Sequence, residues 1–411
     1  MEVMDALPRA TLAIPPVGRV SHHWQAESDG MSSRAQVAAG SGTYESTVPI
    51  DLASLAPVLS PGIASDAEEA AAALTRFDTY ARATLGPDSP TLGPMASILL
   101  RTESASSSQI ENLTVGARQL ALAEIDQATS ANARTVVANV RAMRAALDLA
   151  DRLDAESILT MHRELLSGQT GWEAHAGRFR TTLVWVGSSS ISPRGATHVG
   201  PQPEHVSAAV ADLVEFMRRQ DLPVLVQVAL AHAQFETIHP FTDGNGRTGR
   251  ALVHAMLRAK GVTRHTTAPV SAGLLVDTES YFGALTAFRA GDAWPIVEQF
   301  TRASRYAAMA GTRLVDDLAA QVADSRERMS GLRPQAAAWR VLPHLVAHPV
   351  VNARFLRDHL GLSDVTAQRA LAQLADAGVV RERTGMRRNR VWQHDGVLAV
   401  LDLFAQAIHR R

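Results

Sequence analysis

The segment IHPFTDGNGRTGR, residues 238–250, gathers many of the side chains in this chain that could do chemistry. It holds a histidine, an aspartate, an asparagine, three glycines and two arginines. Histidine accepts a proton near neutral pH, a carboxylate can bind Mg²⁺, and guanidinium groups grip phosphate oxygens in pairs. Because these groups lie so close together in the sequence, the segment predicts a site that handles a polyphosphate.

The backbone of this segment should favour anion binding. The preceding helix, expected at about 223–238, should end just before Pro240, because a residue that precedes proline is disfavoured in the α conformation. His239 is therefore expected at the broken end of that helix. Gly244 and Gly246 allow positive φ and close approach, so consecutive N–H groups can form an anion nest. The helix that follows presents its N-terminal donors to the same place.

Two arginines and one aspartate complete the predicted phosphate site. Arg247 and Arg250 are three residues apart and should share one face of the helix expected at about 247–260. Asp243 should face the same region as a hard oxygen ligand for Mg²⁺. The segment is not a P-loop, because the GxxxxGK[ST] pattern is missing and Lys260 is the only lysine.

Residues 239–250 resemble the complete signature of Fic-domain proteins, HPFx[DE]GNGRxxR, with no departure. The resemblance covers roughly residues 50–305. It implies a mainly helical Fic fold and a protein adenylyltransferase, which transfers AMP from ATP, with Mg²⁺, to a Ser, Thr or Tyr hydroxyl of a target protein or of the enzyme itself. It also admits a homodimer.

The resemblance assigns a role to each residue of the signature. His239 would be the catalytic base that deprotonates the target hydroxyl, and Asp243 would hold Mg²⁺. Asn245 and the amides of 244–246 would cradle the α-phosphate, while the two arginines would hold the β- and γ-phosphates. The residues implied in nucleotide binding are Asp243, Gly244, Asn245, Gly246, Arg247, Thr248, Gly249, Arg250 and Tyr281.

Two further segments could contact substrates. Residues 182–199 alternate apolar and polar around a Gly-Ser turn, which predicts a short β-hairpin. This hairpin resembles the family's flap, whose edge strand would hold the target segment by main-chain pairing; an ordinary structural hairpin explains the pattern equally well. Tyr281 and Phe282 resemble an aromatic pair near the adenine and ribose. Tyr281 is favoured as the nucleotide contact, although a core role fits as well.

The stretch SSQIEN, residues 107–112, places Ser107 and Glu111 on one face of a helix. Taken alone, it is a polar helix turn that ends near Asn112. Beside the Fic signature it resembles the family's inhibitory motif, [ST]xxxE[GN]. The implied role of Glu111 is to pair with Arg250 where the γ-phosphate must sit, so that bound ATP is misaligned for in-line attack.

Helical spacing places these segments along the chain. The predicted organisation is an irregular segment at 1–45, an N-terminal helical region with the inhibitory helix at 46–165, the Fic catalytic domain at 166–305, a helical linker at 306–333 and a winged helix-turn-helix at 334–411. Further helices of the catalytic region are expected at about 204–220, 278–289 and 292–308.

The winged helix-turn-helix is predicted from three short helical patterns, AAWRVLPHLVAH, NARFLRDHLGLS and VTAQRALAQLADAGVV, followed by two β-like runs joined at Thr384-Gly385. Ser363 should cap a helix that exposes Thr366, Gln368 and Arg369, the usual position for reading base edges.

The segment 381–390 carries five arginines against one glutamate, a local charge of +4 that suits phosphate contacts. DNA binding through residues 363–390 is therefore predicted, with protein docking or dimerisation as the alternative.

Composition bounds these interpretations. At 411 residues the chain exceeds one ordinary core. A net charge of −1 gives no global attraction to nucleic acid or membranes, and the absence of cysteine removes disulfides and thiolate zinc sites. The N-terminus lacks a signal-peptide pattern and no 18-residue apolar run occurs, so a cytoplasmic protein without membrane contact is expected. Abundant Ala and the use of Arg in place of Lys indicate a bacterial, GC-rich genome by codon bias.

Three alternatives stay open. The first is a metal-dependent hydrolase. Glu236 and His239 have the i, i+3 spacing of helical metal-carboxylate sites, but no second Glu-x-x-His occurs in the sequence. A DNA-binding transcriptional regulator could use the Fic region only as a nucleotide sensor. The same signature could also remove AMP, as a deAMPylase, or transfer a different nucleotide.

Overall fold

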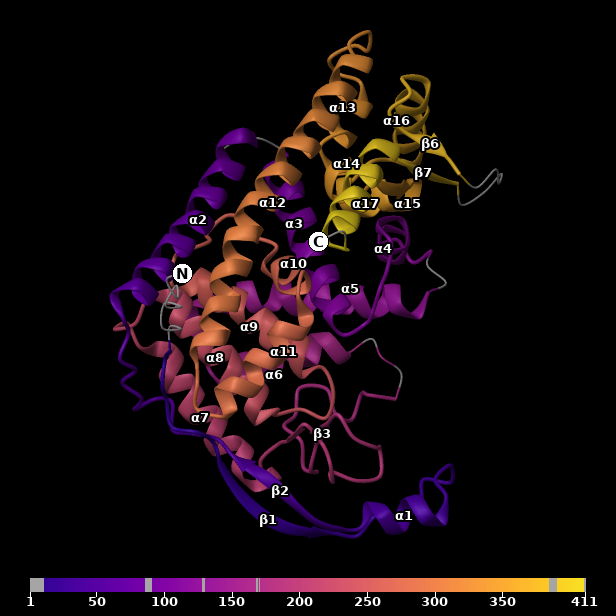
Figure 1. Ribbon diagram of the computed structural model, residues 1–411. Helices are drawn as coiled ribbons and strands as arrows, with labels where there is room; N and C mark the ends of the chain where they lie inside the picture. Colours follow the sequence, from indigo (N-terminus) through magenta and orange to yellow (C-terminus); the bar gives the residue numbers. More distant parts are fainter. Residues whose placement is uncertain are drawn as a thin grey trace, which may run out of the picture. The chain divides into compact units, whose positions relative to one another are not determined.

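The structure is a computed structural model that describes residues 11–85, 91–127, 130–167, 169, 171–383 and 390–409. It is mainly helical, as predicted, and its described strands form three small antiparallel sheets. Figure 1 shows these elements in sequence colours. The chain divides into two compact units: unit 1 contains Met1–Ala71, Ala145–Lys260 and Asp277–Thr301, and unit 2 contains Ala72–Arg144, Gly261–Val276 and Arg302–Arg411.

Helix α8, Val224–Ile238, is the centre of unit 1. Every residue from Leu225 to Ile238 is buried, because most of its residues are apolar or small and buried polar side chains such as Gln227 and Gln234 form hydrogen bonds. Its neighbours are α7 (Pro203–Arg218), α9 (Asn245–Ala259) and α11 (Thr278–Arg289). Helices η1, Ala150–Arg152, and α6, Ala155–Leu166, also pack on α9. The helices predicted around the loop are thus confirmed within a few residues.

Residues 18–48 differ from the irregular segment that composition predicted. Strand β1, Gly18–Trp24, pairs antiparallel with β2, Gly42–Val48, and helix α1, Arg34–Gly40, lies between them in the sequence. Aromatic and β-branched residues occupy the paired stretches and favour strands, whereas Gly and Ser concentrate in the connections. Ser33 begins α1 with a capping box that Gln36 completes. The expectation of irregular structure is therefore wrong for this segment.

The hairpin predicted at 182–199 is present, with very short strands. Strand β3, Trp185–Val186, pairs antiparallel with β4, His198–Val199, so the paired part is two residues long on each side. We call residues 182–199 the flap.

Unit 2 contains helices α3 (Leu92–Ile110), α4 (Ala117–Glu124) and α10 (Val270–Leu275). Three long helices, α2 (Pro61–Leu85), α5 (Ala131–Asp148) and α12 (Trp294–Arg328), each contain a boundary between the units. A buried carboxylate joins α3 to α10: Glu103, fully buried, accepts hydrogen bonds from the backbone N–H (2.9 Å) and hydroxyl of Ser271. Such a charge-assisted contact fixes the packing of the two helices.

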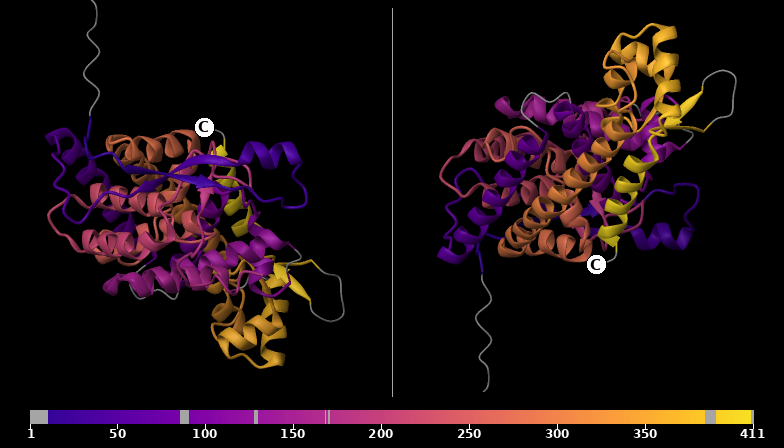
Figure 2. Two further views of the ribbon diagram at one scale, coloured as in Figure 1. Left: turned by 90° about the horizontal axis from the view of Figure 1, so that it is seen from below. Right: turned by 90° about the horizontal axis from the view of Figure 1, so that it is seen from above.

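The C-terminal part of unit 2 has its own hydrophobic core, and both views of Figure 2 show its orange-to-yellow elements as one cluster. Its elements are α13 Ala337–Val341, α14 His344–Ala347, β5 Val350–Asn352, α15 Ala353–Leu360, α16 Asp364–Asp376, β6 Arg381–Glu382, β7 Val391–Gln393 and α17 Asp395–His409. The sheet order is β5-β7-β6. The single helix expected over AAWRVLPHLVAH is two, because Pro343 has no N–H to continue the first. The turn predicted at Thr384-Gly385 lies outside the described residues.

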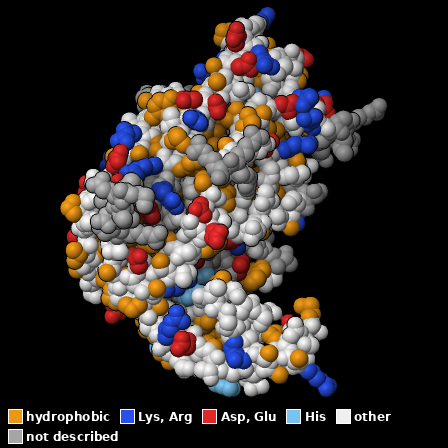
Figure 3. Space-filling view, viewed as in Figure 1, with side chains coloured by type: hydrophobic (Ala, Val, Ile, Leu, Met, Phe, Trp, Pro, Cys, Tyr) orange, Lys and Arg blue, Asp and Glu red, His pale blue; other side chains and the backbone are white. Residues whose placement is uncertain are grey.

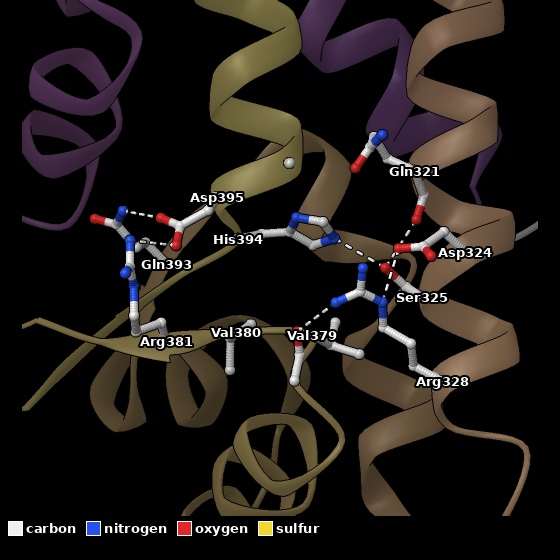
Figure 4. A pocket seen from close by; sticks show the side chains of 12 residues that line it. Gln321, Asp324, Ser325, Arg328, Val379, Val380, Arg381, Gln393, His394 and Asp395 are labelled. Atoms are coloured by element: carbon white, nitrogen blue, oxygen red, sulfur yellow. Dashed lines mark hydrogen bonds and ion pairs between the residues drawn. The ribbon is translucent and has the colours of Figure 1, made fainter.

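A cavity of about 240 Å³ lies between the last turns of α12 and the start of α17 (Figure 4). Its polar groups bind one another: the His394 ring and the Ser325 hydroxyl are 2.9 Å apart, and Arg328 bonds both the Asp324 carboxylate (2.9 Å) and the Gly378 carbonyl (3.0 Å). These hydrogen bonds around the cavity hold α12 to the C-terminal elements.

No helix in the described part of the chain combines the length and the apolar character needed to cross a membrane.

Candidate active site

The chain leaves α8 through a left-handed residue. His239 has φ 49° and ψ 61°, and its N–H still donates to the Phe235 carbonyl at 2.9 Å. The predicted end of the helix just before Pro240 is therefore confirmed. A non-glycine residue in this conformation costs on the order of 1–3 kcal/mol and persists only where neighbours hold it.

Arg180 holds this break in the helix. Its side chain donates from Nε to the His239 carbonyl (2.8 Å), from Nη2 to the Pro201 carbonyl (2.7 Å) and from Nη1 to the Thr182 carbonyl (2.9 Å). Burial lowers the pKa of Arg180 to about 10, so it keeps its charge at neutral pH. Sequence reasoning missed this residue, because a lone arginine in a loop has no periodic signal.

The His239 ring is oriented by its neighbours. Its Nδ1 lies 3.7 Å from the Glu236 carboxylate, and 19% of its side chain is exposed. The His198 ring lies edge-on to it with ring centroids 6.2 Å apart. Burial, followed by the nearby charge of Arg289, lowers the pKa of His198 to about 2, and its Nε2 is 2.9 Å from the Thr237 carbonyl. His198 is therefore neutral and donates from Nε2.

The loop after Pro240 is fixed by Asn245 and His162. The Asn245 side chain accepts from the Phe241 N–H and donates to the Phe241 carbonyl, both at 2.8 Å. The His162 ring stacks on Phe241 at 3.7 Å, accepts from the Gly177 N–H at Nδ1 and lies 3.1 Å from the Asp243 carbonyl at Nε2. Burial lowers the pKa of His162 to about 4, so the neutral ring donates from Nε2 to Asp243. Asn245 thus shapes the loop that it was predicted to line.

Gly244 supplies the positive φ that the predicted nest requires. It has φ 77° and begins α9, and a Cβ there would lie 2.7 Å from a Leu165 methyl carbon. The first N–H groups of α9 follow directly and have no carbonyl of their own helix to bind. Gly246 is half-buried in this first turn, and the loop therefore offers backbone donors to an anion.

The two arginines of the signature are nearly fully buried. Arg247 and Arg250 are 3% and 2% exposed, and Arg247 pairs with the Asp243 carboxylate at 3.0 Å. The Asp243 side chain is 40% exposed, so its carboxylate remains accessible from solvent. This fits one oxygen ligand of Mg²⁺, which takes one or two carboxylates together with substrate phosphates.

Two other residues predicted in nucleotide binding serve the packing of α9. Thr248 is fully buried, and a Cβ on Gly249 would lie 3.0 Å from the Phe235 ring and 3.1 Å from a Glu236 carboxylate oxygen. Gly249 therefore lets α9 approach α8 closely, a role that its place in the signature did not indicate.

The aromatic pair on α11 is divided between the core and the surface. Tyr281 is 1% exposed, and its hydroxyl lies 2.7 Å from Nε2 of His232, whose pKa burial lowers to about 3. Phe282 is 51% exposed. Tyr281, the favoured nucleotide contact, is thus packed in the core, and Phe282 is the exposed ring of the pair.

The predicted inhibitory residues belong to unit 2. Helix α3 ends at Ile110, Glu111 caps it, and Asn112 follows with φ 63°, which confirms the predicted end of the helix near Asn112. Ser107 is fully buried within the last turns of α3. The residues predicted for nucleotide binding and transfer, from His239 to Arg250 and Tyr281, all belong to unit 1.

The described residues contain no group of three or more His, Asp or Glu that could hold a metal ion. The pair Glu236 and His239 thus has no further ligand of these types beside it, as a metal-carboxylate centre would require.

Two family models match the chain. Residues 152–257 match the Fic/DOC family, and residues 64–148 match its N-terminal region. The protein adenylyltransferase fic-1 of Caenorhabditis elegans is 32% identical over 158 residues, 38% of this chain and 28% of the relative. The protein adenylyltransferase Fic of Nematostella vectensis is 30% identical over 155 residues, 37% of this chain and 32% of the relative. The chain thus spans about a third or less of the length of these relatives.

A solved Fic family protein from Desulfovibrio desulfuricans has a similar fold. The match has a TM-score of 0.51 at 22% identity and covers 82% of this chain and 97% of the other. It confirms the predicted fold class.

The buried histidines predict an acid-sensitive fold. His162, His198 and His232 have pKa values lowered to about 4, 2 and 3, below the 6.5 of an unfolded chain. The neutral histidines contribute fully to the free energy of unfolding above pH 6.5. This contribution is lost as the pH falls toward the pKa values of the folded protein, because only the unfolded chain then binds the protons. At pH 5 the loss is about 2 kcal/mol for each histidine.

Urea unfolding at pH 7.5 and 5.0 measures this effect. The His162→Gln variant should lose roughly a third of the pH dependence that these three rings produce, whereas a change at exposed His175, to Ala, should leave it as in the wild type. Equal pH dependence in all three proteins would contradict the assignment.

Proposed function

We propose that the Fic domain carried by this chain is a protein adenylyltransferase that transfers AMP from Mg-ATP to a Ser, Thr or Tyr hydroxyl of a target protein or of itself. This proposal rests on how a few residues of unit 1 are arranged. One oriented histidine, His239, is followed within the same unit by a nest of backbone donors and by the buried Arg247 and Arg250. The relatives named protein adenylyltransferase support it.

In the proposed reaction the target hydroxyl oxygen attacks the α-phosphorus and pyrophosphate leaves. His239 takes the hydroxyl proton at Nε2, because its Nδ1 faces Glu236, 3.4 Å from the backbone carbonyl and 3.7 Å from the carboxylate. Asn245 and the N–H groups of 244–246 stabilise charge on the α-phosphate, and Arg247 and Arg250 hold the leaving pyrophosphate. Asp243 would hold Mg²⁺, which would supply neutralisation of the phosphate charge. Phe282 and Tyr281 would lie near the adenine and ribose, and the Tyr281 hydroxyl contacts the His232 ring.

The nucleotide-binding set also includes Gly244, Gly246, Thr248 and Gly249. Gly244 and Gly246 contribute through their backbone N–H groups and the shape of the loop, and Thr248 and Gly249 through the packing of α9. A substitution at Gly249 would push α9 away from α8 and move both arginines, so this residue supports phosphate binding from a distance.

Replacing His239 with Ala should abolish AMP transfer, with a loss of about 10²–10⁴ in rate, while ATP affinity changes little. The reason is that phosphate binding rests on the loop amides and arginines. Incorporation of α-labelled ATP measures transfer, and titration with a fluorescent ATP analogue measures affinity. Transfer by the variant at a rate close to that of the wild type would show that His239 is not the base.

We also propose that the activity is restrained by Glu111. The supporting observations are that Glu111 caps α3, that buried Ser107 precedes it by one helical turn, and that the N-terminal Fic model spans 64–148. Glu111 would pair with Arg250 and take the place of the γ-phosphate, which misaligns the α-phosphate of bound ATP.

Replacing Glu111 with Gly should raise AMP transfer roughly 10- to 100-fold, because a charge-assisted contact of about 1.5–3 kcal/mol is lost and Arg250 becomes available. Ser107→Ala should act in the same direction but more weakly, since Ser107 would only orient the carboxylate. Adding Arg250→Ala to Glu111→Gly should remove the gain. Equal incorporation of label by wild type and Glu111→Gly would contradict the proposed restraint.

For the C-terminal elements we propose a winged helix-turn-helix that binds DNA through residues 363–390. The supporting observations are that Ser363 caps α16 through the Thr366 N–H, and that Gln368 and Arg369 are exposed while Thr366 is half-buried. The arginines nearest β6 and β7 are partly neutralised: Arg381 and Arg383 contact Asp395, and Arg390 contacts Glu382. Figure 3 shows basic and acidic side chains close together there. Residues 384–389 lie outside the described residues.

The full chain should retard duplex DNA at low salt, with affinity that falls steeply as salt rises. Arg369→Ala should weaken binding roughly tenfold if α16 enters a groove, whereas Arg218→Ala, a change to an exposed arginine of unit 1, should not. Absence of retardation at low salt for random and upstream genomic duplexes would favour the protein-docking or homodimer interpretation.

One measurement separates the enzyme from its rivals. Intact-mass analysis after incubation with Mg-ATP detects added AMP. A regulator that only senses a nucleotide would bind ATP without gaining mass, and a deAMPylase would lose AMP from a modified protein instead. A gain matching another nucleotide, after incubation with the corresponding triphosphate, would change the substrate and leave the transferase chemistry.

A further inference from the structure

The flap is too small to hold its own shape. Its strands β3 and β4 pair over two residues each, and a two-stranded hairpin of that size is not stable alone in water. The proposed function nevertheless needs its edge at a fixed place relative to His239. The shape of the flap must therefore be set by what packs against it.

The segment that packs against it is residues 18–48, which we call the brace. Its strands β1 and β2 pair over seven residues, from Gly18 with Val48 to Trp24 with Gly42. One face is aromatic: the His22 and Tyr44 rings stack at 5.4 Å, and the Trp24 ring lies edge-on to Tyr44 at 6.1 Å.

This aromatic face contacts the flap and the residues just after it. The Trp24 ring lies edge-on to Trp185 of β3 at 5.3 Å, and its Nε1–H donates to the Ile191 carbonyl at 2.8 Å. The Tyr44 hydroxyl accepts from the Gln202 side chain at 3.0 Å. One tryptophan therefore touches both a strand of the flap and its turn.

The turn of the flap also caps the C-terminal end of helix α1 in the brace. Arg194 Nη1 donates to the Ala39 and Ser41 carbonyls, both at 2.6 Å, and the Ser192 hydroxyl donates to the Gly40 carbonyl at 2.6 Å. Carbonyls at the end of a helix lack partners within it, so these bonds satisfy the brace and fix the turn at once.

The other end of the flap is tied to the base. The Gly200 N–H donates to the Val184 carbonyl at 3.0 Å, His198 bonds the Thr237 carbonyl, and Arg180 bonds Pro201 together with His239. Hydrogen bonds thus tie the brace to the turn of the flap, and tie the other end of the flap to the backbone around the proposed base.

We propose that residues 18–48 position the target by bracing the flap, so that an extended polypeptide segment bearing the hydroxyl pairs with the outer edge of β3. This inference rests on the proposed function. Strand β4 covers one edge of β3, no other described strand pairs with β3, and Val186 is 45% exposed. The brace lies before the two matched family regions, residues 64–148 and 152–257.

Hydrogen exchange on the full chain tests the brace without any need for activity. Trp24→Ala and Arg194→Ala should each speed exchange of the Thr197 and Gly200 amides roughly tenfold or more, while amides of α8 and α9 keep their protection. Trp24→Phe, which keeps a ring but loses the N–H, should fall between. The matched control is His23→Ala, because His23 is an exposed neighbour on β1. Unchanged exchange in Trp24→Ala and Arg194→Ala would overturn the inference.

Self-modification with α-labelled ATP tests positioning. The transfer rate at saturating ATP should fall roughly tenfold in Trp24→Ala and Arg194→Ala, while the ATP concentration for half-maximal rate stays unchanged. A loosened flap with an unchanged transfer rate would overturn the positioning role. If the wild type transfers no AMP, the proposed function fails, and the exchange experiment alone then decides whether the brace holds the flap.

Discussion

The left-handed backbone at His239 is the constraint on which the rest of the site depends. This conformation turns the chain out of α8 and into the loop that begins α9, so it places the proposed base and the phosphate-binding amides side by side along the chain. The strain is offset by Arg180, which donates to the His239 carbonyl and to two further carbonyls around it. A buried, permanently charged fork suits this task because each of its donors finds an acceptor. The positions of the proposed base and of the anion-binding amides are therefore both set by the backbone conformation at His239.

Burial distinguishes three supporting histidines of unit 1 from the proposed base, His239. His162, His198 and His232 are almost fully buried, and burial keeps them neutral at physiological pH, so each acts as a fixed donor or acceptor. His239 differs because part of its side chain is exposed and its Nδ1 faces the Glu236 carboxylate. The same residue type thus serves two purposes, and the difference lies in solvent access rather than in chemistry.

The residues proposed for AMP transfer and the residues proposed to inhibit it lie in different units. Unit 1 contains the flap, the brace and every residue proposed for transfer, whereas unit 2 contains Ser107, Glu111 and the C-terminal elements. Three helices, α2, α5 and α12, pass from one unit to the other. The brace works within unit 1.

The sequence by itself determined the helices, the break before Pro240 and the identity of the loop, because these depend on local rules: proline disfavours the helix, glycine permits positive φ, and periodicity marks buried faces. Only the tertiary structure decided what holds the loop. Arg180 and His162 act across long sequence separations, and burial separates Tyr281 from Phe282, so no local pattern identifies their roles. The two strands within residues 18–48 were missed because their Gly- and Ser-rich connection dominated the composition, whereas their pairing over seven residues is visible only in the tertiary structure.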